Sequence, residues 1–560
     1  MIGLFFMMGV ALSLDPVAHE TVTKAEMKRA LEGLKLPNQA VPHHITVTVS
    51  TGHFSSVRAQ DGAVTSSQSG PSRDLRVDVR VGDSDFDNGN FRPSMGIPDG
   101  VFSRRPADEY SDLSFQRELW LALDAAYKGA TQTYAAKEAA REGRDGPFAP
   151  DLLPIQSPTV LPYRAHRITD ETKLKTLVRQ LATQAAAPEH LEDSALAAGD
   201  WAGSGLVMTS EDTSAWIPTT FTIVRAEMIA RANDGSRLRN TRSWVAASPD
   251  KLPNVDDMIE SVNEATAWLK ALHDAPIEED YLGPVLFEAP AAAELFRQVL
   301  HPEISGTPPW EYAPDSSDSD TRPIPVSRIG RRLLPAGWNV WDDPTENPQL
   351  ASHYTHDYEG VPARRVDAIQ DGVLRDVLMS RVPRADRTQS TGHGRSSGLN
   401  RRVAMPAQVT VKPKKTMPLS RMQRVALRHA KSAGNDYVLV VRRLVPPALS
   451  EDFEFAFTGD GPLAGLTPPS EVHRLYPDGR TEPVRGLRFS GVDRRSLRDI
   501  IAASTTHESV EMTDSAEQSA RFSLSDLGGH PVSWAVPSVV IGEMELRGAG
   551  GGEARVISAP

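Results

Sequence analysis

The sequence predicts an α+β fold in two domains: an N-terminal antiparallel sheet with helices, and a strand-rich C-terminal domain. Apolar and polar residues alternate over 43–50 and again over 75–81, which is typical of half-buried antiparallel strands. Residues 114–138 have apolar side chains at helical spacing and are long enough to cover such a sheet. The second half of the chain is rich in apolar runs that favour strands, such as residues 436–444.

The chain has 560 residues, more than one hydrophobic core usually organises, so we expect at least two domains. We place the N-terminal domain at 21–245, a connecting helical segment at 246–279 and the C-terminal domain at 280–560. Residues 1–20 precede these domains as a leader.

The N-terminal elements follow in order. A helix is expected at 24–36, then the two alternating strands, then the long amphipathic helix packed on their sheet. In the second strand, Arg76, Asp78 and Arg80 alternate with apolar residues, so we expect this face of the sheet to contact water. Asn233-Asp234-Gly235 predicts a hairpin turn within residues 221–248.

Two helices are expected in the C-terminal domain. Residues 283–300 are expected to form a helix that packs into a hydrophobic core, with one acid, Glu288, at the entrance to that core. Residues 421–433 form a second helix, because Ser420 can cap its start and Gly434 follows its end.

Charge and cysteine content exclude several classes of function. A net charge of −12 gives no reason to expect a nucleic-acid partner, because phosphate binding needs clustered positive charge. The chain has no cysteine, which removes disulfides, thiol nucleophiles and thiolate-bound metals.

The first fourteen residues are uncharged and apolar. This is the length of a signal-peptide core and too short to span a bilayer, so we expect an exported protein, periplasmic or secreted, with a cytoplasmic location as the alternative. No other stretch is long and apolar enough to predict a membrane span.

The stretch 380–402 combines glycines with hydroxyl and guanidinium groups. Gly392, His393, Gly394 and Arg395 are candidate binding residues, because such a loop can bring backbone N–H groups close to an anionic or peptide ligand. A glycine-rich surface loop is the alternative. Ser396 lies in a GxSxG pattern, but its flanks do not predict the strand and helix that a nucleophile elbow needs.

Residues 353–360 offer His353, His356, Asp357 and Glu359 as potential metal ligands. Their neighbours favour a strand and a turn, in which residues three apart point to opposite faces, so a metal site is not the preferred interpretation.

Several ordered motifs resemble the TldD/PmbA family of peptidase-related proteins, whose PmbA members are also called TldE. They are WDDPTENP (341–348), HYTHDYEGVPARRVDAIQDGVLRDVLMSRVPRA (353–385), STGHGR (390–395) and AGNDYVLVVRRL (433–444). N-terminal segments such as LRVDVRVGDSDFDN (75–88) also fit, and the resemblance spans roughly residues 24–547. It implies a two-domain architecture and a two-subunit assembly that encloses a cavity.

In this family, TldD subunits carry a zinc helix with the pattern His-Glu-x-x-x-His and a later cysteine ligand, and TldE subunits lack them. Matched to this chain, the histidine positions are Phe287 and Ala292, and the catalytic glutamate position is Glu288. Phenylalanine and alanine offer zinc no donor atom, so we expect that the family's zinc is lost and that no cofactor is bound.

The resemblance favours a metal-free, TldE-like subunit that helps form the peptide cavity of a TldD-type metallopeptidase, acting on unfolded peptides or small proteins. Its partner would be a TldD-like subunit or a second copy of the chain. Two alternatives stay open: an active peptidase that uses other ligands, such as His353, His356 or His393 with Glu288, and an exported peptide-binding or quality-control protein without catalytic activity.

Overall fold

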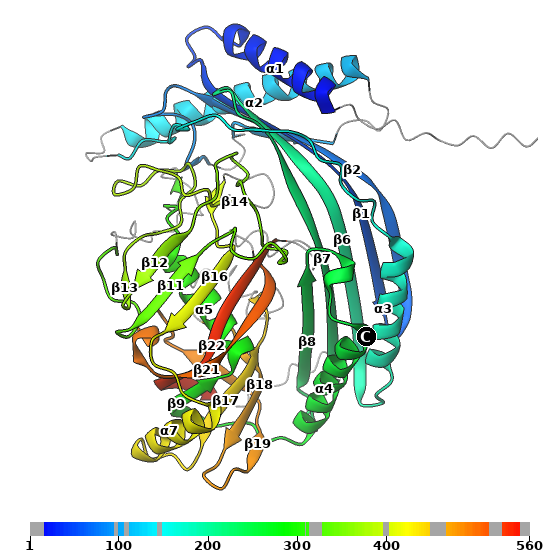
Figure 1. The fold of residues 1–560 in the computed structure, drawn as a ribbon, viewed down its shortest axis with the longest axis vertical. Helices are drawn as coiled ribbons and strands as arrows, with labels where there is room; N and C mark the ends of the chain where they lie inside the picture. The colour runs from blue at the N-terminus through cyan, green and yellow to red at the C-terminus, as the bar shows by residue number, and fades with distance from the viewer. Residues whose placement is uncertain are drawn as a thin grey trace, which may run out of the picture.

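The computed structural model describes residues 16–94, 99–105, 111–142, 148–308, 310–312, 328–395, 402–447, 466–514 and 529–548. Helices and two large sheets confirm the predicted α+β class (Figure 1). Residues 1–15 of the predicted leader (1–20) and Ser396 lie outside the described residues, and the remaining residues of the leader belong to the first helix. No helix among the described residues is long and apolar enough to cross a membrane.

Long, curved strands build the N-terminal sheet (Figure 1). Its strands are β1 (Pro42–Gln60), β2 (Ala63–Val81), β4 (Val101–Arg104), β5 (Val160–Leu161), β6 (Leu191–Thr209), β7 (Ser214–Arg231) and β8 (Arg237–Ala246). They run in the order β4-β2-β1-β6-β7, and β7 pairs with β8 along one stretch and with β5 along another. The predicted hairpin turn is confirmed between β7 and β8, where Gly235 has a φ of +85°.

Four helices cover the outer face of this sheet. They are α1 (Pro16–Gly33), α2 (Asp112–Arg141), α3 (Glu171–Ala186) and α4 (Val255–His273). The predicted long helix is confirmed in α2, whose buried residues pack on Val47 of β1 and Val77 of β2. Helix α1 starts before the predicted 24–36 segment, and Glu20 in it accepts a hydrogen bond of 2.6 Å from the indole of Trp216.

The inner face of the N-terminal sheet corrects one prediction. The alternation in β2 is as expected, with Val77 and Val79 fully buried on the outer side. On the opposite, charged side, Arg80 is buried and Arg76 and Asp78 are half-buried, because residues of the C-terminal half lie over them. Arg80 is only 8% exposed, and its guanidinium bonds to Asp87 at 3.1 Å. Periodicity alone could not distinguish water from a polar protein surface.

The C-terminal half forms an eleven-stranded mixed sheet. Its strands are β9 (Tyr281–Phe287), β11 (Trp338–Asp342), β12 (Val366–Gln370), β13 (Val373–Leu374), β16 (Gln408–Pro413), β17 (Val438–Leu444), β18 (Pro469–Leu475), β19 (Thr481–Pro483), β20 (Leu487–Ser490), β21 (Ile500–Asp514) and β22 (His530–Gly548). The main path is β13-β12-β11-β16-β22-β9-β17-β18-β19, with β20 and β21 also paired to β22. Two small sheets join β3 (Phe91–Arg92) to β10 (Glu311–Tyr312) and β14 (Gly394–Arg395) to β15 (Val403–Ala404).

The segment 283–300, predicted as one helix, is a strand followed by a helix. Residues up to Phe287 form β9, which lies between β17 and β22 at the centre of the sheet. Helix α5 (Ala289–Val299) follows, with Pro290 in its first turn, and the short α6 (His301–Ile304) continues from it. An apolar run of this kind fits either a buried strand or a buried helix, and pairing on both sides decided for the strand.

Helix α7 (Leu419–Ser432) confirms the predicted helix at 421–433 but not its cap. The residue before the helix is Pro418, and no side chain caps the first turn, so the predicted capping by Ser420 is wrong. Gly434 follows the end with a φ of +85°, as its position predicted.

Buried polar contacts join the two halves. Glu471 on β18 accepts hydrogen bonds from Asn240 at 2.9 Å and Arg242 at 2.8 Å, both on β8. At another point, Arg381 donates to the carbonyl of Leu153 at 2.8 Å and pairs with Glu211 at 2.7 Å. These contacts join the C-terminal half to strand β8 and to the segments around Leu153 and Glu211.

Candidate functional site

Glu288 stands where β9 ends and α5 begins. Strands β9 and β17 are parallel neighbours, with Val285 opposite Leu439 and Phe287 opposite Val441. Their carboxyl ends therefore lie at the same edge of the sheet. The Glu288 N–H donates to the carbonyl of Val441 at 2.9 Å, and the Glu288 side chain makes no cap bond to α5.

The carboxylate of Glu288 is paired with an arginine. Nε of Arg442, the residue after Val441, lies 3.5 Å from Oε2 of Glu288. The same guanidinium stands 5.9 Å from the ring centre of Trp268 on α4 and 3.9 Å from Glu471. Glu288 thus has a protein cation beside it.

Burial is the main electrostatic influence at this edge. It raises the pKa of Glu288, while Arg442 acts in the opposite direction. Burial, and then the charge of Arg442, lowers the pKa of nearby His473 to about 4. His473 is therefore neutral at neutral pH.

The two positions that the sequence resemblance matched to zinc-binding histidines are part of the core. Phe287 is fully buried and stacks on Phe489 with ring centres 5.8 Å apart. Ala292 is fully buried in the same cluster, within α5. Within the described ranges, no three His, Cys, Asp or Glu side chains are grouped so that they could hold a metal ion. The donor set around Glu288 therefore does not fit zinc.

The candidate binding residues at 392–395 are buried, so a surface loop is the wrong description of this part of the chain. His393 is fully buried and bonds to the hydroxyl of Thr391 at 2.8 Å. Arg395 donates to the carbonyls of Pro406 and Pro531, both at 3.2 Å. Gly392 has a φ of +70°, which glycine adopts without strain. These residues hold neighbouring segments together, and none of them lines the cavities described below.

Two acids in the preceding loop, Asp357 and Glu359, accept backbone N–H groups, and one of these belongs to Gly394. Asp357 accepts the N–H of Gly394 at 2.7 Å and those of Glu359 and Val361 at 2.9 Å. Glu359 accepts the N–H of Arg381 at 2.7 Å. Burial, followed by the charge of Glu359, raises the pKa of Asp357 to about 8, and burial also raises the pKa of Glu359. The pair therefore retains a proton at neutral pH.

This acid pair makes stability depend on pH. An unfolded aspartate has a pKa of about 3.9, so between about pH 4 and about pH 8 the folded state holds a proton that the unfolded chain releases. The contribution of Asp357 to stability therefore falls as pH rises through this window, by at most about 1.4 kcal/mol per pH unit.

The Glu359→Gln variant is expected to flatten this dependence, because removing the neighbouring charge lowers the pKa of Asp357. Urea unfolding between about pH 5 and about pH 8 measures the slope for both proteins. Burial raises the pKa of Glu511 to about 7, but this contribution is common to both proteins and cancels in the comparison. Equal slopes would contradict the assignment to the Asp357 pair.

A cavity of about 460 Å³ lies over the inner face of the N-terminal sheet. We call it the sheet cavity. Trp201, Val207 and Ile217 from β6 and β7 form its apolar wall. Polar side chains of β1 and β2 line the other side, and Tyr358 and Arg402 close it from the C-terminal half.

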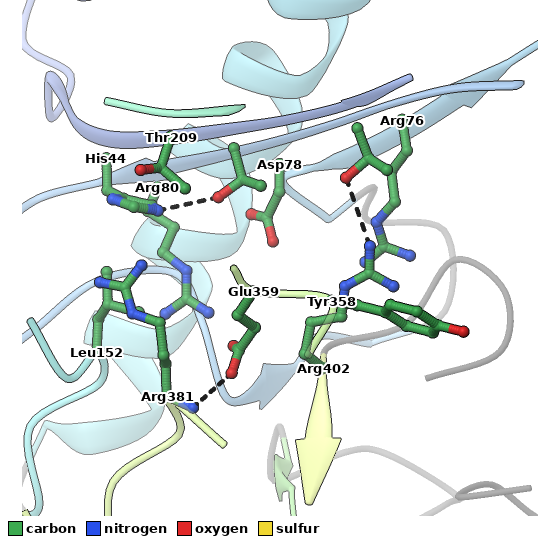
Figure 2. A pocket seen from close by; sticks show the side chains of 12 residues that line it. His44, Arg76, Asp78, Arg80, Leu152, Thr209, Tyr358, Glu359, Arg381 and Arg402 are labelled. Carbon is green, nitrogen blue, oxygen red and sulfur yellow. Dashed lines mark hydrogen bonds between the residues drawn. The ribbon is translucent and has the colours of Figure 1, made fainter. Parts of the chain in front are cut away.

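A narrow recess of about 30 Å³ adjoins the sheet cavity and shares Thr48, Arg76, Tyr358 and Arg402 with it. Figure 2 shows that charged side chains from both halves of the chain meet here. The recess is lined by four arginines and two acids, which are Arg76, Arg80, Arg381, Arg402, Asp78 and Glu359. Burial lowers the pKa of His44, which also lines it, so this imidazole is neutral at neutral pH.

Sequence reasoning missed the sheet cavity and the recess, although one signal for them was present. Arg76, Asp78 and Arg80 alternate along β2 and were assigned to a face in water. Finding the recess required knowing that Tyr358 and Arg402, distant in sequence, lie over this strand.

Comparisons with known proteins agree with this architecture. Residues 280–444 match the family model described as the PmbA/TldA metallopeptidase C-terminal domain. A metalloprotease of Methanocaldococcus jannaschii is 30% identical over 124 residues, which cover 21% of this chain and 27% of that protein. The match thus spans about a quarter of the length of this curated relative.

Two solved structures share the fold over nearly the whole chain. TldE from Thermococcus kodakarensis superposes with a TM-score of 0.56 at 13% identity, covering 95% of this chain and 100% of that one. A proposed modulator of a DNA gyrase from Thermotoga maritima superposes with a TM-score of 0.58 at 12% identity, covering 95% and 99%. Together, these similarities show that residues 280–444 match the PmbA/TldA metallopeptidase C-terminal domain and that the chain shares the fold of these two solved structures.

Proposed function

We propose that this chain is a metal-free, TldE-like subunit that helps form the peptide-binding cavity of a TldD-type metallopeptidase. The observation that carries the proposal is the environment of Glu288. Core side chains, Phe287 and Ala292, occupy the two histidine positions, and Arg442 occupies the space beside the carboxylate.

Each part of this environment opposes zinc catalysis. A catalytic zinc site uses three protein donors, and Phe287 and Ala292 supply none. The guanidinium of Arg442 repels a divalent cation near Glu288. Without a metal to lower the pKa of water from roughly 16 to about 7, a glutamate has no prepared nucleophile to activate.

The sheet cavity supports the peptide-binding part of the proposal. Its volume of about 460 Å³ lies in the range of roughly 300 to 1,000 Å³ typical of ligand sites. It combines an apolar wall at Trp201 and Ile217 with hydroxyls such as those of Ser50, Ser204 and Thr219. An unfolded peptide offers the matching groups, apolar side chains and backbone amides.

The proposal is tested with metal analysis and a peptidase assay on the purified full chain. After dialysis against zinc, the chain is expected to retain no more metal than its Glu288→Gln variant and to leave unfolded peptides uncut. Addition of a TldD-type subunit that carries His-Glu-x-x-x-His is expected to give a complex that cleaves them. Stoichiometric zinc in the chain alone, with chelator-sensitive cleavage lost in Glu288→Gln, would contradict the proposal.

The apolar residues 1–14 favour a second function, an exported peptide-binding protein that works without an enzyme partner. Size-exclusion chromatography of the native protein separates the two proposals. Elution with a metallopeptidase subunit supports the first, and elution without one from a periplasmic or secreted fraction supports the second.

A further inference from the structure

Arg76 and Arg402 mark the junction between the sheet cavity and the recess, since both line each of them. Arg76 comes from β2 and Arg402 from the segment before β15, and Figure 2 shows their guanidinium groups directed toward one another. Arg402 also lies 3.5 Å from the hydroxyl of Thr48 and 5.6 Å from the ring centre of Tyr358. Two like charges are therefore brought together on a surface that the fold has partly removed from water.

Arg80 and Arg381 are held by partners around the wall of the recess. Arg80 bonds to Asp87 and to the carbonyl of Asp151, each at 3.1 Å. Arg381 bonds to the carbonyl of Leu153 and pairs with Glu211. These contacts hold Arg80 and Arg381 in place and fix the shape of the recess.

Two carboxylates, those of Asp78 and Glu359, also line the recess. Glu359 accepts the N–H of Arg381 at 2.7 Å. Asp78 stands between the Arg80 group and the Arg76–Arg402 group in Figure 2, and its charge favours the charged forms of Arg80 and Arg402. Burial nevertheless lowers the pKa of Arg402, despite the neighbouring acids. An anion beside Arg402 would offset this cost of burial.

The volume of the recess limits the size of the anion that can bind there. One water needs roughly 10–15 Å³ of such volume, so a recess of about 30 Å³ accommodates about two water-sized groups, as in the two oxygens of a carboxylate. Guanidinium groups match a carboxylate with paired N–H donors. The body of the ligand would continue into the sheet cavity, where Trp201 and Ile217 form the apolar wall.

We propose that Arg76 and Arg402 bind the carboxylate of a peptide, preferentially its free C-terminus, with the terminal apolar side chain against Trp201 and Ile217. This inference rests on the proposed peptide-binding function. It adds the orientation of the bound peptide, whose C-terminus would lie in the recess. The same chemistry would accept an acidic side chain, which the test separates from the C-terminus.

The test measures binding to the full chain by fluorescence anisotropy. Three labelled unfolded peptides are compared: one ending in leucine as the free acid, the same peptide as the C-terminal amide, and the amide with an internal glutamate. The free acid is expected to bind about tenfold to a hundredfold more tightly than the plain amide, as charge-assisted hydrogen bonds allow. The Arg76→Gln and Arg402→Gln variants are expected to reduce its affinity to that of the amide, and Arg428→Gln, on the exposed side of α7, to leave it unchanged.

Each other outcome has a definite meaning. Equal binding of acid and amide overturns carboxylate recognition and leaves the peptide-binding function standing. Binding of none of the peptides overturns both. Tight binding of the glutamate-containing amide overturns the preference for the C-terminus and supports a side-chain carboxylate in the recess. The comparison of peptides on the unaltered chain decides even if a variant fails to fold.

Discussion

The Glu471→Ala variant is expected to lower the free energy of unfolding by about 3–5 kcal/mol, the cost typical of breaking a buried ion pair. Glu471 is 1% exposed and lies beside three arginines, Arg242, Arg442 and Arg443. Burial is the largest single influence and opposes the ionisation of Glu471, but the charges of Arg242 and Arg443 and the hydrogen bonds from Asn240 and Arg242 together lower its pKa. Removing the carboxylate would leave the buried guanidinium of Arg242 without its counter-charge.

Urea unfolding followed by circular dichroism measures this effect, and limited proteolysis shows whether the two halves separate. Glu471 joins β18 to β8, so its loss is expected to expose the segment around 246–280 to protease. The matched Glu471→Gln variant keeps an acceptor for Asn240 and Arg242 and is expected to lose less stability. An Ala variant as stable as the unaltered protein would show that Glu471 does not hold the halves together.

The Lys137→Met variant is expected to have a similarly large effect within the N-terminal domain. Lys137 on α2 is fully buried and donates to Asp151 at 2.6 Å and to the carbonyls of Gly89 at 2.7 Å and Asp87 at 2.9 Å. Methionine fills a similar volume but donates no hydrogen bond, so the buried carboxylate of Asp151 loses its cation and two carbonyls lose a donor. We expect a loss of about 3–5 kcal/mol in unfolding experiments.

A control on the same helix separates the buried charge from helix propensity. Lys128 pairs with Asp124 one turn away on the exposed surface of α2, and Lys128→Met is expected to cost at most about 0.5 kcal/mol. Combining Lys137→Met with Asp151→Asn should recover part of the lost stability, because the unpaired carboxylate is removed as well. Additive losses in the double variant would show that Lys137 and Asp151 do not act as a pair.

The metal-free proposal and the carboxylate proposal concern different parts of the molecule. Glu288 lies at the carboxyl ends of β9 and β17, whereas Arg76 and Arg402 lie over the inner face of the N-terminal sheet. A subunit without a metal can therefore still contribute to peptide binding. The experiments above separate these two properties, since one measures metal and cleavage and the other measures affinity.

The sequence predicted those elements whose signal is local. The long helix at 114–138 and the hairpin at Asn233-Asp234-Gly235 were placed correctly because helical periodicity and turn chemistry are properties of neighbouring residues. The predictions for 283–287 and for the cap at Ser420 were wrong. An apolar run becomes a strand only through its partners, and a cap forms only when the chain enters the helix at that residue.

By itself, the sequence determined that Phe287, Glu288 and Ala292 stand at the positions on which the metal-free proposal rests and that the chain has no cysteine. Only the tertiary structure decided what surrounds these residues. Arg442 lies beside Glu288 because β9 and β17, distant in sequence, are parallel neighbours. The recess likewise exists because Arg402 is brought over β2. Such pairings depend on burial and hydrogen bonding across the whole fold, which no local pattern records.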